Sequence, residues 1–344
     1  KGFYEGEIAE KISKEITENN GLITKSDLKK YNPIWRDPLI SDYRDTKVIT
    51  MGPPSSGGLH VIQMLNILEN YDLNKIGHNS SEYINLLAEV MKYAYADRSK
   101  YLGDPDFFEV PINKITSKEY ANEINKNIEI GKLRPANQIL PGKFMRKESH
   151  ETTHFSVVDK QGNVVSMTYT LNSTFGSKVV IEGTGILMNN EMDDFSAAPG
   201  VPNQFNLLGA EANEIAPFKR PLSSMTPTIV LKNDELFFTT GSPGGARIIS
   251  AVLQSILNII DFNMNLEDTT LAKRIHHQWY PDILEYEFSL DKIIENDLKK
   301  IGYKTSSKLP LTSLQTIMFA DGIYYGYGDF RRVDALASGK IYDW

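Results

Sequence analysis

Thr152 is the residue of this 344-residue sequence whose type and position best fit covalent chemistry. The sequence has no cysteine, which excludes thiolate nucleophiles, disulfides and cysteine-based metal sites, and it shows no convincing Ser-His-Asp set. A hydroxyl nucleophile then needs another base, and its own α-amine can serve once the preceding peptide bond is cut. Such a nucleophile lies at the start of a strand after a flexible linker, as Thr152 does. An ordinary β-strand threonine has the same surroundings, and spacing alone favours that simpler interpretation.

The middle of the chain changes pattern abruptly, and we place a domain boundary there. Residues 104–151 are rich in Pro, Lys, Asn and Glu with little periodicity, which predicts an exposed, mobile connection. Residues 152–158 and 164–170 have strand-like patterns on either side of a turn, which predicts a β-hairpin. The sequence therefore divides into a first part, residues 1–151, and a second part, residues 152–344.

The first part is predicted to be mostly helical up to about residue 102. The clearest helix follows Asn79, where Asn79 and Glu82 form a capping pattern ahead of an apolar face. A short strand is predicted at residues 47–51, followed by a Gly-Pro-Pro-Ser-Ser-Gly-Gly loop at residues 52–58. This loop could cradle a ligand, but a plain strand-to-helix connection is the simpler interpretation.

The second part combines strands with helices. A helix is predicted from residue 246 to residue 261, directly after the Gly-Ser-Pro-Gly-Gly turn at residues 241–245. Backbone N–H groups converge at such a turn, so it could bind an anion. Because no repeating βαβ unit is present, the pattern predicts an α+β layered fold rather than a Rossmann fold. Further strands are predicted at residues 178–182, 185–189, 227–232, 236–240, 313–319 and 323–328.

The composition narrows the classes of function. The formal net charge is -7, and no basic run is long enough to neutralise a phosphate backbone, which argues against nucleic acid as a partner. No apolar stretch approaches the roughly 20 residues of a membrane-spanning helix. The six histidines lack metal-binding spacing. We therefore expect no membrane span in this chain, no metal and no cofactor, with small molecules or peptides as partners.

Several motifs together resemble one family. Residues 151–159, Glu-Thr-Thr-His-Phe-Ser-Val-Val-Asp, resemble the processing site of gamma-glutamyltranspeptidases, in which the first threonine becomes the N-terminus of the small subunit. Further motifs follow in the family order at residues 168–172, 187–195, 219–227 and 241–247. The resemblance extends back into the large subunit through residues 52–58, Tyr-Ala-Asp-Arg at 95–98 and Tyr-Leu-Gly-Asp-Pro at 101–105.

The resemblance implies a four-layer αββα sandwich of N-terminal-nucleophile hydrolase type, with a mostly helical large-subunit lobe. Residues 1–151 would be the C-terminal part of the large subunit, lacking its first half, and residues 152–344 the small subunit. The family implies autocatalytic cleavage between Glu151 and Thr152, a heterodimer of the two products, and export to the periplasm or the medium.

The resemblance also assigns catalytic roles. Thr152 would attack the γ-carbonyl of a glutamyl group, and Thr170 would hold the nucleophile by a hydroxyl hydrogen bond. Backbone N–H groups of Gly244 and Gly245 would stabilise the oxyanion. Transfer of the γ-glutamyl group to water gives hydrolysis, and transfer to an amino acid or dipeptide gives transpeptidation.

A γ-glutamyl substrate such as glutathione presents an α-ammonium and an α-carboxylate, and the resemblance assigns residues to each. Asn172, Glu191 and Asp194 would bind the ammonium, while Ser223 and Ser224 would bind the carboxylate. Without the resemblance, solvated turns and an ordinary loop are the simpler interpretations of these residues.

Two departures from the family pattern matter. The family also binds the carboxylate with an arginine from the early large subunit, a segment outside this sequence. Phe205 stands in the lid-like segment 196–208 where a tyrosine is common, and it lacks the hydroxyl that would contact Asn172. We therefore expect a looser lid and faster exchange of acceptor or water.

Alternative functions stay open. A relative acting on poly-γ-glutamate or on a glutaryl amide would use the same chemistry with a different pocket. A truncated or unprocessed form that binds γ-glutamyl compounds without turnover is the alternative from a different class.

Overall fold

The computed structural model describes residues 2–140, 152–198, 201, 207–310 and 312–339. Its centre is an antiparallel six-stranded sheet with the order β1-β2-β7-β8-β12-β13. The strands are β1 Leu39–Tyr43, β2 Thr46–Thr50, β7 Thr228–Lys232, β8 Glu235–Thr240, β12 Gln315–Ala320 and β13 Ile323–Gly328. The first two strands precede Thr152 and the other four follow it, so both predicted parts of the chain build one sheet.

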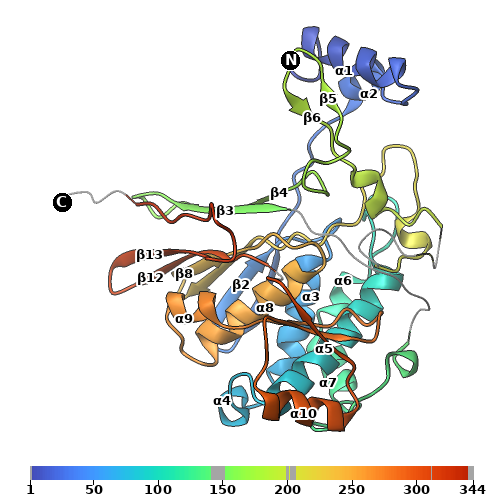
Figure 1. The fold of residues 1–344 in the computed structure, drawn as a ribbon. Helices are drawn as coiled ribbons and strands as arrows, with labels where there is room; N and C mark the ends of the chain where they lie inside the picture. Colours follow the sequence, from blue (N-terminus) through green and yellow to red (C-terminus); the bar gives the residue numbers. More distant parts are fainter. Residues whose placement is uncertain (1, 141–151, 199–200, 202–206, 311, 340–344) are drawn as a thin grey trace.

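Helices cover one face of this sheet (Figure 1). The three central ones are α3 Gly57–Leu68, α5 Ser81–Tyr101 and α8 Arg247–Ile260. Every residue of α3 is buried, because this helix lies against both α5 and α8. The main hydrophobic core consists of apolar side chains from these helices and the sheet, including Val48, Val230 and Phe238.

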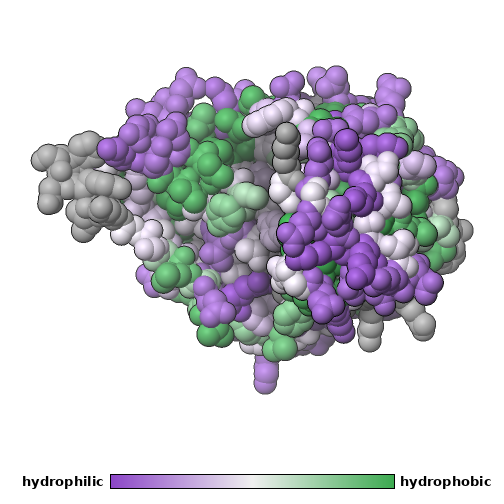
Figure 2. Space-filling view, turned by 90° about the horizontal axis from the view of Figure 1, so that it is seen from above, coloured by the Kyte–Doolittle hydropathy of each residue, from purple (hydrophilic) through white to green (hydrophobic). Residues whose placement is uncertain are grey.

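A two-stranded hairpin lies over the other face of the sheet (Figure 1). Strands β3 Thr153–Val158 and β4 Val164–Tyr169 pair from Thr153 with Tyr169 to Val158 with Val164, as the sequence predicts. The outer side of the hairpin is apolar and exposed, at Phe155, Val157, Val165, Met167 and Tyr169. Figure 2 shows apolar surface on this side of the molecule.

The predicted α+β class is therefore confirmed. The described residues supply a helical layer, the six-stranded sheet and the hairpin layer. A small unit projects beyond these layers (Figure 1), where α1 packs on α2 and on β5. The unit consists of α1 Glu7–Glu18, α2 Lys25–Lys30, β5 Val180–Ile181 and β6 Ile186–Leu187.

The sequence correctly placed the strand at 47–51, the strands of the second part and the helix after the glycine-rich turn, each within two residues or so of the observed bounds. It missed β1 and a small three-stranded sheet. That sheet and the remaining helices of the second part are β9 Ile275–His276, β10 Leu284–Glu287, β11 Thr305–Lys308, α9 Leu266–Leu271 and α10 Lys292–Ile301.

Two predictions need correction. Ser80, not Asn79, caps α5, because the Ser80 hydroxyl accepts the N–H of Tyr83 while Asn79 has a left-handed backbone with φ of 54°.

The segment predicted as a mobile connection is folded up to residue 140, because apolar side chains such as Ile115 and Ile124 are buried. It contains α6 Ile112–Ile115, α7 Lys118–Asn125 and the short helix Ala136–Gln138, while α4 Leu73–Ile76 precedes it. Residues 141–151 lie outside the described part.

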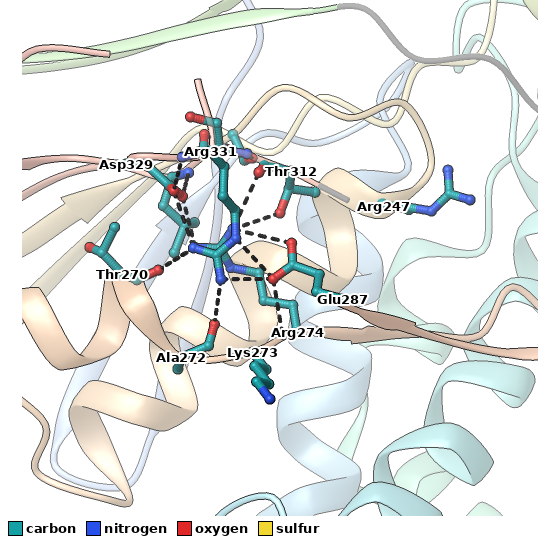
Figure 3. Close-up of polar contacts among 12 residues, drawn as sticks. Arg247, Thr270, Ala272, Lys273, Arg274, Glu287, Thr312, Asp329 and Arg331 are labelled. Carbon is teal, nitrogen blue, oxygen red and sulfur yellow. Dashed lines mark hydrogen bonds and ion pairs between the residues drawn. The ribbon is translucent and has the colours of Figure 1, made fainter. Parts of the chain in front are cut away.

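A buried cluster of charges fixes the chain after β13 (Figure 3). Arg274 donates to Asp329 at 2.9 Å, and Arg331 donates to Glu287 at 2.9 Å and to Asp329 at 3.1 Å. All four side chains are at most 3% exposed. Asp329 also accepts the backbone N–H of Leu314 at 2.8 Å, so the cluster ties the last segment to the strand entering the sheet.

Candidate active site

Thr152 lies immediately before β3 and is 8% exposed. Two residues later, the buried His154 ring lies against Gly241, where a Cβ atom would come within 2.1 Å of the ring. Only glycine therefore permits the hairpin to lie this close to the turn before α8. The start of the second part and the glycine-rich turn are neighbours in the structure.

The His154 ring supports the hairpin and does not act as a base for Thr152 here. Its Nδ1 lies 2.9 Å from the Thr168 hydroxyl and its Nε2 lies 3.3 Å from the Ser156 hydroxyl. Burial lowers the pKa of His154 to about 4, so the ring is neutral at neutral pH.

Gly244 and Gly245 end the glycine-rich turn with φ of 136° and 54°, a region that favours glycine. Their carbonyls accept the N–H groups of Arg247 and Ile248 at 3.1 Å, which starts α8. The turn is also held from behind, because the Ser242 hydroxyl donates to the Ser313 carbonyl at 3.1 Å. The turn thus presents the N-terminus of a 14-residue helix near the start of β3.

Thr170, Asn172 and Glu191 come together at a second point. The backbone N–H of Asn172 donates to the Thr170 hydroxyl at 2.8 Å, and its side-chain amide donates to the Asn190 carbonyl at 3.1 Å. Asn172 is 3% exposed and has φ of 73°. Asn190 leads directly into the short helix Glu191–Asp194, and a hydrogen bond from Thr170 reaches the Glu191 carboxyl.

Glu191 and Asp194 form a partly buried acidic pair. Burial raises the pKa of both carboxyls, and for Asp194 the neighbouring Glu191 raises it further, while Arg98 acts in the opposite direction. The Glu191 Oε1 atom is buried without a hydrogen-bond partner in the described part of the chain. The pair is therefore electrostatically suited to receive a cation.

Ser223 and Ser224 lie against the loop at residues 52–58. The backbone N–H of Ser56 donates to the Ser223 carbonyl at 2.9 Å, and that of Ser223 donates to the Pro54 carbonyl at 2.9 Å. A Cβ atom on Gly57 would come within 2.1 Å of the Thr226 hydroxyl, so glycine permits this close approach. The loop does more than connect a strand to a helix, because it positions both serines.

Arg98 connects this serine pair to the acidic pair. It comes from α5, is 4% exposed, and donates to the hydroxyls of Ser56 at 2.9 Å and Ser224 at 3.1 Å. A space of about 10 Å³ is lined by Arg98 and Asp194 together with Ser196, Asn213 and mostly apolar residues. Asp194 of the acidic pair and Arg98, which holds Ser224, thus border one space.

Sequence reasoning assigned no role to Arg98 or Ser56, although both lie in segments quoted for the resemblance. Their placement depends on contacts between residues that are far apart in the sequence, with separations of 42, 126 and 167 positions. No local pattern reveals such contacts. The predicted cleavage residue Glu151 and the predicted lid residue Phe205 lie outside the described residues.

Within the described ranges, no group of three or more His, Asp or Glu side chains is arranged to hold a metal ion. Over the same ranges, no helix is both long and apolar enough to span a membrane.

Comparison with known proteins defines the class and then the family. The chain superposes on a cephalosporin acylase from Bacillus halodurans with a TM-score of 0.81 and 28% identity, over 96% of this chain and 58% of that one. A mutant of Helicobacter pylori gamma-glutamyltranspeptidase matches with a TM-score of 0.51 and 48% identity, over 52% of this chain and 100% of that one. These neighbours place the fold among the N-terminal-nucleophile hydrolase sandwiches.

The model of the gamma-glutamyltranspeptidase family matches residues 1–339. The glutathione hydrolase proenzyme of Escherichia coli (strain K12) is 52% identical over 338 residues, which are 98% of this chain and 58% of that protein. The chain belongs to the gamma-glutamyltranspeptidase family. It spans somewhat over half the length of the curated relatives it matches.

Proposed function

We propose that this protein transfers and hydrolyses γ-glutamyl groups of glutathione and related amides through a threonine-linked γ-glutamyl ester. The observation that carries the proposal is the placement of Arg98, which donates to the Ser224 hydroxyl and lies across a small space from Asp194. The acidic pair complements the α-ammonium of a glutamyl group, and Arg98 with the serine hydroxyls complements its α-carboxylate.

The reaction begins with cleavage of the bond between Glu151 and Thr152, which frees the α-amine of Thr152. The Thr152 hydroxyl then attacks the γ-carbonyl carbon while this amine takes the hydroxyl proton. The C–N bond of the substrate breaks, the leaving amine receives the proton, and an ester remains. Water or the amine of an amino acid or dipeptide attacks the ester and regenerates Thr152.

Thr170 and the turn before α8 complete this mechanism. The Thr170 hydroxyl would hold Thr152, and Gly244 and Gly245 would donate backbone N–H groups to the oxyanion. Loss of one such donor typically removes about 3 kcal/mol of transition-state stabilisation. The two products of cleavage would form a heterodimer, and a location in the periplasm or outside the cell is part of the same proposal.

A glutaryl amide is the second candidate substrate, favoured by the similarity to a cephalosporin acylase. A glutaryl group lacks the α-ammonium, however, and would leave Glu191 and Asp194 without the charge that complements the pair. The acidic pair therefore favours a glutamyl group. Poly-γ-glutamate would have to present its terminal residue, because internal residues carry an amide nitrogen in place of the ammonium.

The test is the intact mass of the purified protein after incubation at neutral pH, together with turnover of a chromogenic γ-glutamyl anilide. We expect two fragments that meet between Glu151 and Thr152, with hydrolysis of the anilide. The Thr152→Ala variant should remain uncut and inactive. A single uncut chain that binds γ-glutamyl compounds without turnover would instead support the non-catalytic alternative.

A further inference from the structure

Arg98 is a buried cation whose hydrogen bonds go only to hydroxyl groups. In the described part of the chain it donates to Ser56 and Ser224, and no carboxylate lies within ion-pair distance. Burial lowers its pKa to about 10, so it stays protonated at neutral pH. The nearby Asp194 carboxylate favours the charge of Arg98 without forming an ion pair within the described residues, whereas burial disfavours that charge. This raises the question of what the guanidinium positions.

The hydrogen-bond directions at the two serines answer that question. Arg98 Nη2 donates to the Ser224 hydroxyl oxygen at 3.1 Å, and the backbone N–H of Met225 donates to the Ser223 hydroxyl oxygen at 3.1 Å. Both oxygens act as acceptors in these contacts, so each hydroxyl hydrogen is available for another acceptor. Two hydroxyl donors beside a guanidinium suit one anion.

Arg98 also fixes where these donors lie. Its Nε donates to the Ser56 hydroxyl, which itself donates to the Ser223 carbonyl at 2.7 Å. The guanidinium therefore holds the loop at residues 52–58 and the segment at 223–224 at one distance from α5. Asp194 and Arg98 line the same small space, so opposite charges lie on its border.

We propose that Arg98 is the positioning residue of the carboxylate end of the site. It directs the Ser224 hydroxyl toward the α-carboxylate, fixes Ser223 through Ser56, and supplies the positive potential that balances the bound anion. This inference rests on the proposed function and deepens it. It names a residue through which the site prefers ligands with an α-carboxylate over ligands without one.

The experiment compares the affinity of the protein for two amides by calorimetry. L-glutamine carries the α-carboxylate, whereas 4-aminobutyramide is the same molecule without it. We expect Arg98→Met to weaken L-glutamine binding about 10- to 100-fold and 4-aminobutyramide binding less than about threefold. Arg98→Lys should fall in between, because lysine keeps the charge but not the rigid fork that reaches both hydroxyls.

Arg44→Met is the matched control, because Arg44 donates to Asp261 and to backbone carbonyls away from the cavity. It should leave both affinities unchanged. Equal losses for the two ligands, or no loss with Arg98→Met, would overturn the role of Arg98. If Arg98→Met does not fold, the same comparison with Arg98→Lys and Ser224→Ala decides.

Failure of the proposed function gives a different result. If the unchanged protein binds neither amide, both the glutamyl site and the role of Arg98 are overturned. If it binds L-glutamine and Arg98→Lys binds both ligands as the unchanged protein does, the glutamyl site stands and only the role of Arg98 is lost.

Discussion

The buried arginines Arg274 and Arg331 differ from the buried Arg98 in what surrounds them. Arg274 and Arg331 meet the carboxylates of Glu287 and Asp329, and the four charges sum to zero (Figure 3). Arg98 meets two hydroxyls and has no carboxylate at ion-pair distance in the described residues. The charges of the first cluster balance without a ligand, whereas the charge of Arg98 is not balanced by an ion pair within the described residues.

This difference separates a role in stability from a role in recognition. Removing one member of a complete buried cluster leaves an uncompensated charge, so the free energy of unfolding should fall. Removing Arg98, which makes no ion pair in the described residues, takes away a charge that burial disfavours, so stability should change little while ligand binding suffers. The predictions below test this contrast, in order of expected size.

The largest effect on stability is expected for Asp329→Ala. This change leaves Arg274 and Arg331 with one carboxylate, and the free energy of unfolding should fall by about 3–5 kcal/mol in denaturant titrations. Asp297→Ala is the control, because Asp297 pairs with the exposed Lys300 on the surface and should change stability by less than about 1 kcal/mol. Similar small losses for both variants would mean that the buried cluster is not a structural element.

Asp194→Asn should produce the largest effect on substrate preference. Loss of the negative charge would remove the proposed partner of the α-ammonium, so kcat/KM for a γ-glutamyl anilide should fall about 100-fold or more. Turnover of a glutaryl anilide, which lacks the ammonium, should fall much less. A uniform loss for both anilides would contradict a charge-reading role for Asp194.

The acidic pair also predicts how binding depends on pH. The pKa values of Glu191 and Asp194 are raised, so acidification protonates them at a higher pH than ordinary carboxyls. Protonation weakens their attraction for an ammonium. The affinity for L-glutamine should therefore fall as pH decreases, by at most about tenfold per pH unit and per proton bound. Calorimetry with the Asp194→Asn variant should show a flatter profile, and an affinity that rises on acidification would contradict the prediction.

The smallest effect is expected for the stability of Arg98→Met. Methionine can occupy much of the volume without a charge, so the free energy of unfolding should change by less than about 1 kcal/mol or increase. Denaturant titration beside Asp329→Ala checks this expectation. A loss as large as that of Asp329→Ala would mean that Arg98 is as structural as the buried cluster.

Local sequence patterns predicted the strands and helices whose periodicity is long enough to detect. The hairpin at residues 153–169 and helix α8 follow from alternation and from helical spacing. Strand β9 has two residues and carries no detectable period, so the small sheet was missed. The cap of α5 was placed one residue early because Asn79 and Ser80 are both capping residue types, and only their backbone angles distinguish them.

The prediction of the site depended on the family resemblance much more than on local sequence patterns. Ser223 and Ser224 look like an ordinary loop, and the partners described above lie 126 to 169 residues away. Arg98 lies in the last turns of the long helix α5, whose periodicity indicates core packing and not a pocket. Contacts at this separation are set by the sheet and helix packing of the whole fold.

The pairing of β2 with β7, from Lys47 with Leu231 to Thr50 with Thr228, joins chain segments on opposite sides of the proposed cleavage site. If the bond before Thr152 is cut, folding changes from a reaction of one molecule to an encounter of two. The linker no longer supplies a high effective concentration, and the equilibrium stability of the pair becomes dependent on dilution. The cut protein would then persist through slow unfolding, having reached its fold while still a single chain.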